Sequence, residues 1–390
     1  MSLLVEIEKQ LGNFHLDVRF QAETETLALL GASGCGKSMT LKCIAGIMTP
    51  DRGRIVLNGR VLFDSEARID LPPQQRRVGY LFQNYALFPT MTVEKNILCG
   101  ICSGSKAEKA VALSATLHRF RLEGLEKRYP AQLSGGQQQR VAIARTLAPE
   151  PAVLFMDEPL SNLDAKLRLE MRSELQRLHI DTGSTFIYVT HDQMEAMTLA
   201  TKICLIDNGV LQQYDAPLDV YNKPNNLFVA DFVGNPAINF MEAKGRQAPD
   251  GTVELEVFAG TRLAFTPRTP LDLPDWFARA DAQDAEKKAA EQAKQSQKGH
   301  VEKGNKAPPF RCHIAKVNET EDFGDEAVLS DEDFVLGVRP EFLSISEHGA
   351  LEAEVYSAMP TGMETTVKLR IGEYLLTGVI FGGVLYQIGQ

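Results

Sequence analysis

Short runs of apolar residues alternate with longer segments of helical pattern along most of the chain before residue 235. These runs lie at residues 26–30, 78–82, 152–156, 185–190 and 203–206. They are apolar at consecutive positions, which is typical of strands buried on both faces of a parallel sheet. Strands that alternate with helices predict an α/β fold with polar residues gathered at the strand ends, where ligands bind.

The segments around these runs predict further elements of the same domain. Residues 3–7 and 15–20 alternate enough to predict two strands, and residues 54–63 predict a hairpin with Asn58-Gly59 at its tip. From residue 92 to residue 129 the pattern becomes helical, with a polar break at residues 103–105. We place a helical subdomain at about residues 84–150.

The pattern changes near Gly234-Asn235-Pro236, which predicts one domain at residues 1–234 and a second at residues 235–390. Many short strands separated by turn residues predict a small β-barrel or sandwich in the second domain. The alternating runs lie at residues 252–258, 262–265, 310–315, 334–338, 352–356, 365–371 and 374–381. Residues 275–306 are rich in Ala, Glu, Lys and Gln, and they predict a solvated helix or a mobile insertion without a site.

A phosphate-binding loop, G-x-x-x-x-G-K-[ST], connects the apolar run at residues 26–30 to a helix-compatible stretch at residues 39–45. Its glycines let backbone N–H groups turn inward around a polyphosphate, and the helix start adds unpaired donors. We expect Lys37 to reach the β- and γ-phosphates and the Ser38 hydroxyl to ligate Mg²⁺. The loop consists of Gly31, Ala32, Ser33, Gly34, Cys35, Gly36, Lys37 and Ser38.

Polar residues follow three of the apolar runs. Asp157 and Glu158 end the run at residues 152–156, as in a Walker B strand. Asp157 is expected to hold Mg²⁺, and Glu158 to polarise the attacking water, a role that typically contributes about 10²–10⁴-fold in rate. Gln83 can reach Mg²⁺ and the water, and His191 can bind a γ-phosphate and hold Glu158. Without the phosphate loop, the Asp157-Glu158 pair would be read as a solvated strand end. A lone histidine at a strand end, such as His191, is more often structural.

A second glycine motif, Leu133-Ser134-Gly135-Gly136-Gln137, precedes a helical run at residues 138–147. Ser134 and the glycine amides would form another anion site at a helix N-terminus. Because one nucleotide already has its own loop, this second phosphate site is expected to face the ATP of another copy. We therefore expect a head-to-tail homodimer with two ATP molecules at the interface, where residues 161–164 also pack.

In order and spacing, these motifs resemble those of the ATP-binding cassette (ABC) ATPases, from Leu3 to about Asn235. The resemblance implies a P-loop NTPase fold in which Gln83 lies in the Q-loop and His191 is the switch histidine. Residues 133–137 would form the signature, and residues 161–164 the D-loop. It also places a further set of residues at the ATP, namely Ser134, Gly135, Gly136, Gln137 and Asp164.

Two positions depart from the family pattern. Met39 stands where relatives usually have a second Ser or Thr, so one hydroxyl contact to the α-phosphate should be missing at this ATP-binding position. The aromatic residue that stacks on adenine usually lies in an N-terminal loop, and Phe14 is the nearest candidate.

Within the family the resemblance is split near residues 148–154. Residues 160–172, 188–197 and 215–234 resemble the ATPase subunits of sugar importers of the maltose and glycerol-phosphate type. Gly337-Val338-Arg339-Pro340-Glu341 matches a motif of their regulatory C-terminal β-domain (TOBE), which is related to the oligonucleotide-binding (OB) barrel. Relatives continue beyond the position of Gln390, so we expect this barrel to be incomplete. Residues 53–64 and 76–80 look closer to molybdate and sulfate importer ATPases.

The resemblance implies the ATP-hydrolysing subunit of an importer, most simply for carbohydrate, with an oxyanion (molybdate or sulfate) importer as the alternative. Three other classes fit less well. A chromosome-maintenance or repair ATPase carries a long coiled coil inside the cassette, but residues 83–133 have no sustained heptads. A ribosome-associated ATPase normally has two cassettes. A non-hydrolysing module is disfavoured by Lys37, Glu158 and His191.

Charge and apolar patterning limit the partners. A net charge of −10 over 390 residues argues against nucleic acid and anionic membranes as general partners. No apolar stretch is long enough to span a bilayer, and the N-terminus does not look like a signal peptide. We therefore expect the chain at the cytoplasmic face of the membrane, bound to permease subunits, with a solute-binding protein acting indirectly.

Residues 83–93 are the segment expected to receive a permease helix, with core packing as the alternative for about half of its apolar residues. These residues are Tyr85, Leu87, Phe88 and Met91. Cys99 and Cys102 form an isolated C-x-x-C, for which zinc or redox chemistry stays open, although reduced structural thiols are favoured.

Overall fold

The structure, a computed structural model, describes residues 2–101, 104–258, 260–279, 281–282, 285–286, 314–317, 334–346 and 348–390. The chain divides into a compact unit that reaches Val229 and a second unit that begins at Ala230. The domain boundary predicted at residue 234 stays a prediction. Among the described residues, no helix combines the length and the apolar character needed to cross a membrane.

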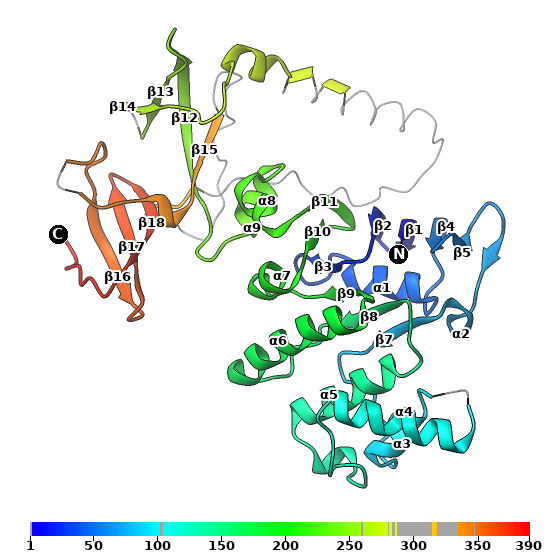
Figure 1. Ribbon diagram of the computed structural model, residues 1–390. Coiled ribbons are helices and arrows are strands. Elements are labelled where there is room, and N and C mark those ends of the chain that lie inside the picture. Colours follow the sequence, from blue (N-terminus) through cyan, green and yellow to red (C-terminus); the bar gives the residue numbers. More distant parts are fainter. Residues whose placement is uncertain are drawn as a thin grey trace. The chain divides into compact units, whose positions relative to one another are not determined.

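A mixed sheet of eleven strands forms the centre of the first unit, in the order β6-β5-β4-β1-β2-β11-β10-β3-β9-β8-β7 (Figure 1). The consecutive apolar runs form its parallel part, which confirms that prediction. Every residue of β3, β8 and β9 is buried, because helices cover both faces of this part of the sheet. The strands are β10 (Lys202–Asp207), β3 (Thr26–Leu30), β9 (Thr185–Val189), β8 (Val153–Asp157) and β7 (Val78–Leu81).

Antiparallel hairpins extend the other side of this sheet. The predicted hairpins are confirmed, with Asn58 at φ 51° and Gly59 at φ 76° in the turn between β4 and β5. Alternate residues of β1 and β2 face the main hydrophobic core. The strands are β1 (Leu3–Leu11), β2 (Phe14–Ala22), β4 (Arg52–Leu57), β5 (Arg60–Asp64), β6 (Ile69–Asp70) and β11 (Val210–Asp215).

Helices of the first unit fall into separate groups. In Figure 1, α3, α4 and α5 lie together beyond the β7 edge of the sheet, away from α1. The prediction of helix at residues 120–129 was wrong. The chain turns there because Arg121 has φ 52° and Gly124 has φ 80°, and a right-handed helix does not contain such conformations. The helices are α1 (Lys37–Ala45), α2 (Pro73–Arg76), α3 (Val93–Leu98), α4 (Lys106–Arg119), η1 (Pro130–Gln132), α5 (Gly135–Leu147), α6 (Ala165–Thr182), α7 (Gln193–Leu199) and α8 (Pro217–Asn222). The division between the two units falls within α9 (Leu227–Phe232).

The end of α1 is fixed by a buried arginine. Arg76 is 1% exposed, and its Nη1 donates to the carbonyl oxygens of Cys43 at 2.9 Å and Ile44 at 2.8 Å. Its Nη2 pairs with Asp70 at 2.8 Å. The last carbonyl groups of a helix lack partners within it, and burying one unpaired costs about 1–3 kcal/mol. Arg76 thus stabilises the helix that carries the phosphate loop.

The second unit contains two small antiparallel sheets in the described residues. One has the order β14 (Thr261–Phe265), β13 (Val253–Val257), β12 (Asn239–Gln247) and β15 (Phe334–Val338). The other has the order β16 (Glu354–Pro360), β17 (Glu364–Ile371) and β18 (Tyr374–Phe381). Asn239 joins them, because its Nδ2 donates to the carbonyls of Val338 at 3.1 Å and Thr377 at 2.8 Å.

The strands predicted at residues 252–258, 262–265, 334–338, 352–356, 365–371 and 374–381 are confirmed, whereas β12 was missed and the described residues 314–315 of the run at residues 310–315 are not in a strand. The sheets are open in these residues, so the closed barrel stays a prediction. Residues 310–313 and most of the 275–306 segment lie outside the described residues, although residues 273–279 are helical. Arg339 of the Gly337–Glu341 motif precedes η2 (Pro340–Phe342), and its buried Nη1 donates to the carbonyls of Ala230 and Val233.

Candidate functional site

The phosphate loop between β3 and α1 closes around its own lysine. Lys37 is 6% exposed, and its Nζ donates to the carbonyl oxygens of Gly31 and Ala32, both at 2.7 Å. Both partners are neutral backbone carbonyl groups. Residues 32–34 at the tip of the loop are exposed. The loop therefore presents a neutral tip to solvent, with the lysine ammonium buried behind it.

Two glycines of this loop are required by close packing. A Cβ at Gly31 would lie 2.1 Å from the carbonyl oxygen of Ile206, and a Cβ at Gly36 would lie 2.7 Å from Leu16 Cδ1. Both residues also have positive φ, 148° and 105°. Cys35 is buried beneath the loop, and burial raises the pKa of its thiol, so it stays protonated.

Ser38 and Asp157 meet at the ends of the loop and of β8, as the sequence predicts. Ser38 Oγ donates to Asp157 Oδ1 at 2.6 Å. The motifs did not identify Tyr80, whose hydroxyl donates to the other carboxylate oxygen, Oδ2, at 3.0 Å. Burial, and then the charge of Asp157, raises the pKa of Tyr80, so the phenol remains a donor. Both carboxylate oxygens of Asp157 are thus oriented.

Glu158 lies between the two other predicted catalytic residues. Gln83 Nε2 donates to Glu158 Oε2 at 2.8 Å, and His191 Nδ1 lies 3.2 Å from Glu158 Oε1. The backbone of Glu158 has φ 47°, a conformation that residues other than glycine rarely adopt and that is often found at functional sites. Strand ends from β7, β8 and β9 therefore bring Gln83, Glu158 and His191 together.

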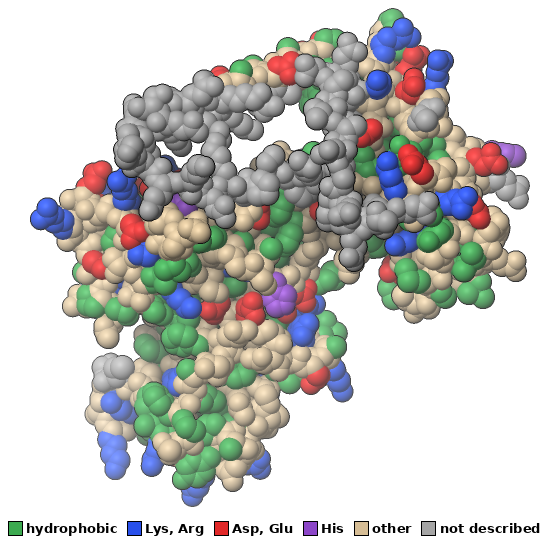
Figure 2. All heavy atoms as spheres, turned by 180° about the vertical axis from the view of Figure 1, so that it is seen from behind, with side chains coloured by type: hydrophobic (Ala, Val, Ile, Leu, Met, Phe, Trp, Pro, Cys, Tyr) green, Lys and Arg blue, Asp and Glu red, His purple; other side chains and the backbone are tan. Residues whose placement is uncertain are grey.

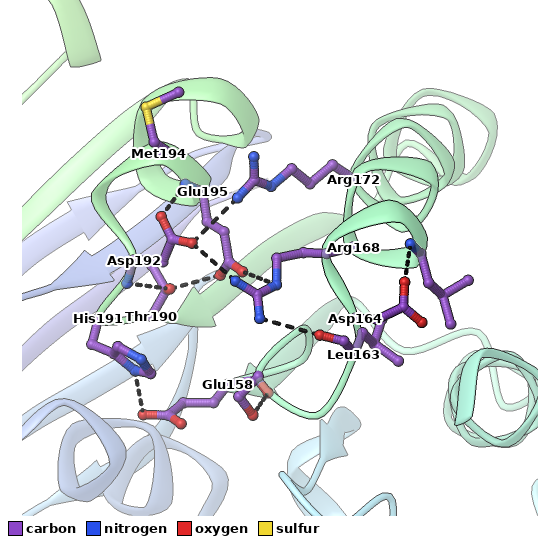
Figure 3. Close-up of polar contacts among 12 residues, drawn as sticks. Glu158, Leu163, Asp164, Arg168, Arg172, Thr190, His191, Asp192, Met194 and Glu195 are labelled. Atoms are coloured by element: carbon purple, nitrogen blue, oxygen red, sulfur yellow. Dashed lines mark hydrogen bonds and ion pairs between the residues drawn. The ribbon is translucent and has the colours of Figure 1, made fainter. Parts of the chain in front are cut away.

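Residues 161–164 connect this cluster to α6 (Figure 3). Ser161 Oγ donates to the carbonyl of Glu158 at 3.0 Å, and Asn162 Nδ2 donates to the carbonyl of Gln83 at 2.9 Å. Asp164 caps α6 by accepting a hydrogen bond from the Leu167 N–H at 2.9 Å. The Asp164 side chain thus has a structural partner, and its contact with ATP stays a prediction.

The glycine motif at residues 133–137 begins α5. Ser134 caps the helix by accepting from the Gln137 N–H at 3.4 Å, and its own N–H donates to Gln137 Oε1 at 3.0 Å. A Cβ at Gly136 would lie 2.9 Å from Leu167 Cδ2, so the motif packs against the start of α6. Ser134 and Gly135 are exposed. In Figure 1, α5 lies with α3 and α4 beyond the β7 edge of the sheet, away from α1.

The two residues that depart from the expected pattern lie beside the loop. A Cβ at Gly36 would come within 3.1 Å of Phe14 Cζ, which puts the Phe14 ring against the loop. Met39 is partly buried and packs against the main core, so it supplies no polar contact. Stacking of adenine on Phe14 stays a prediction.

The apolar residues of the segment predicted to contact a permease helix differ in how far they are buried. Tyr85 is 6% exposed, so core packing is the correct interpretation for this residue. Phe88 is 45% exposed, and the Arg145 guanidinium lies 5.3 Å from its ring centroid. Figure 2 shows apolar side chains gathered on the surface of the α3–α5 group.

The predicted C-x-x-C motif is only partly visible. Cys99 is exposed, and Cys102 lies outside the described residues. In the part of the chain that the structure describes, no three His, Cys, Asp or Glu side chains gather as a metal site would require.

A network of charged side chains behind His191 was also missed. Arg168 of α6 contacts Asp192 and Glu195, and Arg172 contacts Asp192. A cavity of about 60 Å³ lies beside Arg168, and Glu158 and His191 also line it. These contacts join residues distant in sequence, and no local motif marks them. The i, i+4 spacing of the two arginines was the one available signal, because it places both on the same face of a helix.

Comparison with known proteins gives the following similarities. The ABC transporter family model matches residues 14–161. The chain is 48% identical over 223 residues to the trehalose/maltose import ATP-binding protein MalK of Thermococcus litoralis, covering 56% of this chain and 59% of that protein. It is 46% identical over 244 residues to the sn-glycerol-3-phosphate import ATP-binding protein UgpC of Burkholderia thailandensis, covering 62% of this chain and 65% of that protein.

Among solved structures, cbiO1 of Clostridium perfringens, part of the ABC transporter complex cbiONQ, matches 59% of this chain and 94% of its own. The TM-score is 0.51 and the identity is 26%. The chain spans between 59% and 65% of the length of the two curated relatives.

Proposed function

The chain belongs to the ABC transporter ATP-binding family, and from this premise we propose that it hydrolyses ATP to drive an importer. The observation that carries the proposal is the carboxylate of Glu158, held on one oxygen by Gln83 and approached on the other by His191. A carboxylate oriented from both sides at the end of the strand that carries Asp157 is what activation of a water requires.

The phosphate loop fits a nucleotide. Lys37 and the exposed loop amides supply a cation and N–H donors at the start of α1, where the helix dipole favours an anion. Ser38 and Asp157 offer a hydroxyl and a carboxylate that lie 2.6 Å apart, the oxygen ligands that Mg²⁺ prefers. Bound there, Mg²⁺ would neutralise charge on the β- and γ-phosphates. We add the amide oxygen of Gln83 as a further ligand.

The roles of the side chains follow from their contacts. Glu158 would draw a proton from the attacking water. His191 turns its Nδ1 toward Glu158, which leaves Nε2 for an oxygen of the γ-phosphate. Gln83 holds Glu158 and is joined through its carbonyl to Asn162, so the Q-loop and D-loop segments are connected at this point.

Two copies would complete the site. Ser134 and Gly135 are exposed at the N-terminus of α5, a helix that lies away from α1 in Figure 1. An exposed helix N-terminus suits the γ-phosphate of ATP bound to a second copy. We propose a head-to-tail homodimer in which ATP closes the two copies and hydrolysis reopens them.

The two curated relatives are named for import of trehalose/maltose and of sn-glycerol-3-phosphate. We therefore propose a carbohydrate importer, with the chain bound to permease subunits at the cytoplasmic face of the membrane. An oxyanion importer is the alternative, because residues 53–64 and 76–80 resemble molybdate and sulfate importer ATPases. We further propose that residues 235–390 form the regulatory OB-like (TOBE) domain.

Phosphate release by the purified chain, with and without Mg²⁺, tests the ATPase proposal. We expect release that requires both ATP and Mg²⁺. Reconstitution with co-purified permease subunits then tests the importer, because a solute-binding protein loaded with sugar should stimulate hydrolysis, whereas stimulation by a molybdate-loaded protein would favour the alternative. Absence of phosphate release from both the chain and the assembled complex would contradict the proposal.

The Tyr80→Phe variant tests the Mg²⁺ site. It removes the hydrogen bond on Asp157 Oδ2 and lets the carboxylate rotate. Such outer hydrogen bonds typically change metal affinity by roughly 10–100-fold, so we expect the Mg²⁺ concentration for half-maximal hydrolysis to rise about tenfold. A MgCl₂ titration at fixed ATP measures this. Tyr356→Phe, at a tyrosine that is 43% exposed in β16, is the control, and equal midpoints for both variants would remove Tyr80 from this role.

A further inference from the structure

Two arginines of α6 hold the residue next to the switch histidine (Figure 3). Arg168 and Arg172 are one helical turn apart, and both guanidinium groups reach the same oxygen, Asp192 Oδ2. The distances are 3.6 Å from Arg168 Nη1 and 3.3 Å from Arg172 Nη2. Asp192 directly follows His191, so α6 helps to place the histidine that faces Glu158.

Arg168 also contacts the segment before α6. Its Nη2 donates to the carbonyl of Leu163 at 3.2 Å, within residues 161–164. Its Nε lies 4.0 Å from Glu195 Oε1 in α7. A planar guanidinium presents donors in several directions at once, which a lysine ammonium on a flexible stem does not do with the same geometry. One side chain therefore touches both the D-loop segment and the segment that carries His191.

Side chains within residues 190–195 hydrogen-bond to one another and to the backbone of the segment. Thr190 Oγ1 donates to Glu195 Oε2 at 2.7 Å and accepts from the Asp192 N–H at 2.9 Å. Asp192 Oδ1 accepts from the Glu195 N–H at 3.2 Å and so caps α7. A displacement of Asp192 is thus expected to displace His191 with it.

The network is not fully hydrogen-bonded in this structure. Within the described residues, the buried Nε atoms of Arg168 and Arg172 have no hydrogen-bond partner. The contacts of Arg168 with Asp192 and Glu195, at 3.6 and 4.0 Å, are longer than hydrogen bonds. The adjacent cavity of about 60 Å³ leaves room for the guanidinium to move. Because a buried donor without a partner costs free energy, an arrangement that pairs these two Nε atoms is favoured once the neighbouring segment shifts.

We propose that Arg168 is a positioning residue that couples residues 161–164 to the His191–Glu158 pair through Asp192. When the D-loop segment is seated, the Leu163 carbonyl directs the guanidinium of Arg168 onto Asp192, and His191 is held against Glu158. This inference rests on the proposed ATPase function, because the pair that it positions is the proposed hydrolytic one.

The Arg168→Met variant tests the coupling, since methionine keeps an unbranched apolar stem and removes the guanidinium. We expect kcat for ATP hydrolysis to fall at least about tenfold while KM changes less than about twofold, because nucleotide binding uses other residues. Arg168→Lys should recover only part of kcat, since one ammonium cannot serve both Leu163 and Asp192. The matched control is Arg177→Met on the same helix, where the side chain is 73% exposed and pairs with Asp181.

A double-mutant cycle with Asp192→Asn tests whether Arg168 acts on His191 through Asp192. Asparagine retains the cap of α7 but removes the charge that the arginines hold. We expect the double variant Arg168→Met/Asp192→Asn to be no slower than the slower single variant, because both changes break one connection. Losses that multiply would overturn the proposal, as would wild-type kcat in Arg168→Met.

Hydrogen exchange gives a readout that does not depend on hydrolysis. Amides of residues 190–195 should exchange faster in Arg168→Met than in the parent chain and in Arg177→Met. Unchanged exchange there would overturn the coupling even if the parent chain is an active ATPase. Faster exchange in a chain that hydrolyses no ATP would instead support the coupling and contradict the proposed function.

Discussion

The Glu158→Gln variant is expected to lose at least about 100-fold in kcat for ATP hydrolysis while still binding ATP, since general-base roles are typically worth 10²–10⁴-fold. Glutamine preserves the size of the side chain and one of the two acceptor oxygens that face Gln83 and His191, but its amide cannot draw a proton from water. ATP should therefore close two copies that do not reopen. Steady-state phosphate release and light scattering after size exclusion, with ATP present, measure the two effects.

Glu170→Gln provides the control, because the same substitution is made at an exposed glutamate of α6. Turnover unchanged in Glu158→Gln would remove Glu158 from its assigned role. A variant that stays monomeric with saturating ATP at high protein concentration would count against the homodimer.

Lys37→Ala is expected to lower ATP affinity by at least about 100-fold, because it removes the charged hydrogen bond from the lysine to phosphate. Hydrogen bonds to charged groups are roughly twice as strong as hydrogen bonds between neutral groups. In the structure the Lys37 ammonium donates hydrogen bonds to the carbonyls of Gly31 and Ala32 at 2.7 Å, so the substitution also removes two contacts that hold the backbone of the phosphate loop. Fluorescence titration with a labelled ATP analogue measures the affinity.

Lys42→Ala is the matched control for that experiment, since Lys42 lies in the last turn of the same helix. Circular dichroism of both variants establishes that the fold is retained. ATP affinity of Lys37→Ala within about twofold of the parent chain would show that the loop does not use its lysine for phosphate, against the motif assignment.

The elements that the sequence predicted well are those specified by contiguous residues. The buried strands were found because each contains four consecutive apolar residues, and the phosphate loop because all eight of its positions are adjacent in the chain. Residues 120–129 were predicted poorly, because apolar spacing continues there while Arg121 and Gly124 turn the backbone. Strand β12 was missed because its pairing with β13 and β15 is visible only in the folded sheet.

By itself the sequence determined which residues are available for the chemistry: the phosphate loop with Lys37, the acids Asp157 and Glu158, and His191 at a strand end. Parallel strands bring their carboxyl ends to one edge of the sheet, so the sequence also predicted that the residues at these strand ends lie close together. Only the tertiary structure decided that Tyr80 orients Asp157 and that Arg168 joins Leu163 to Asp192. Those contacts depend on the register of β7 beside β8 and on the face that α6 turns toward α7, and neither is encoded in a local run of residues.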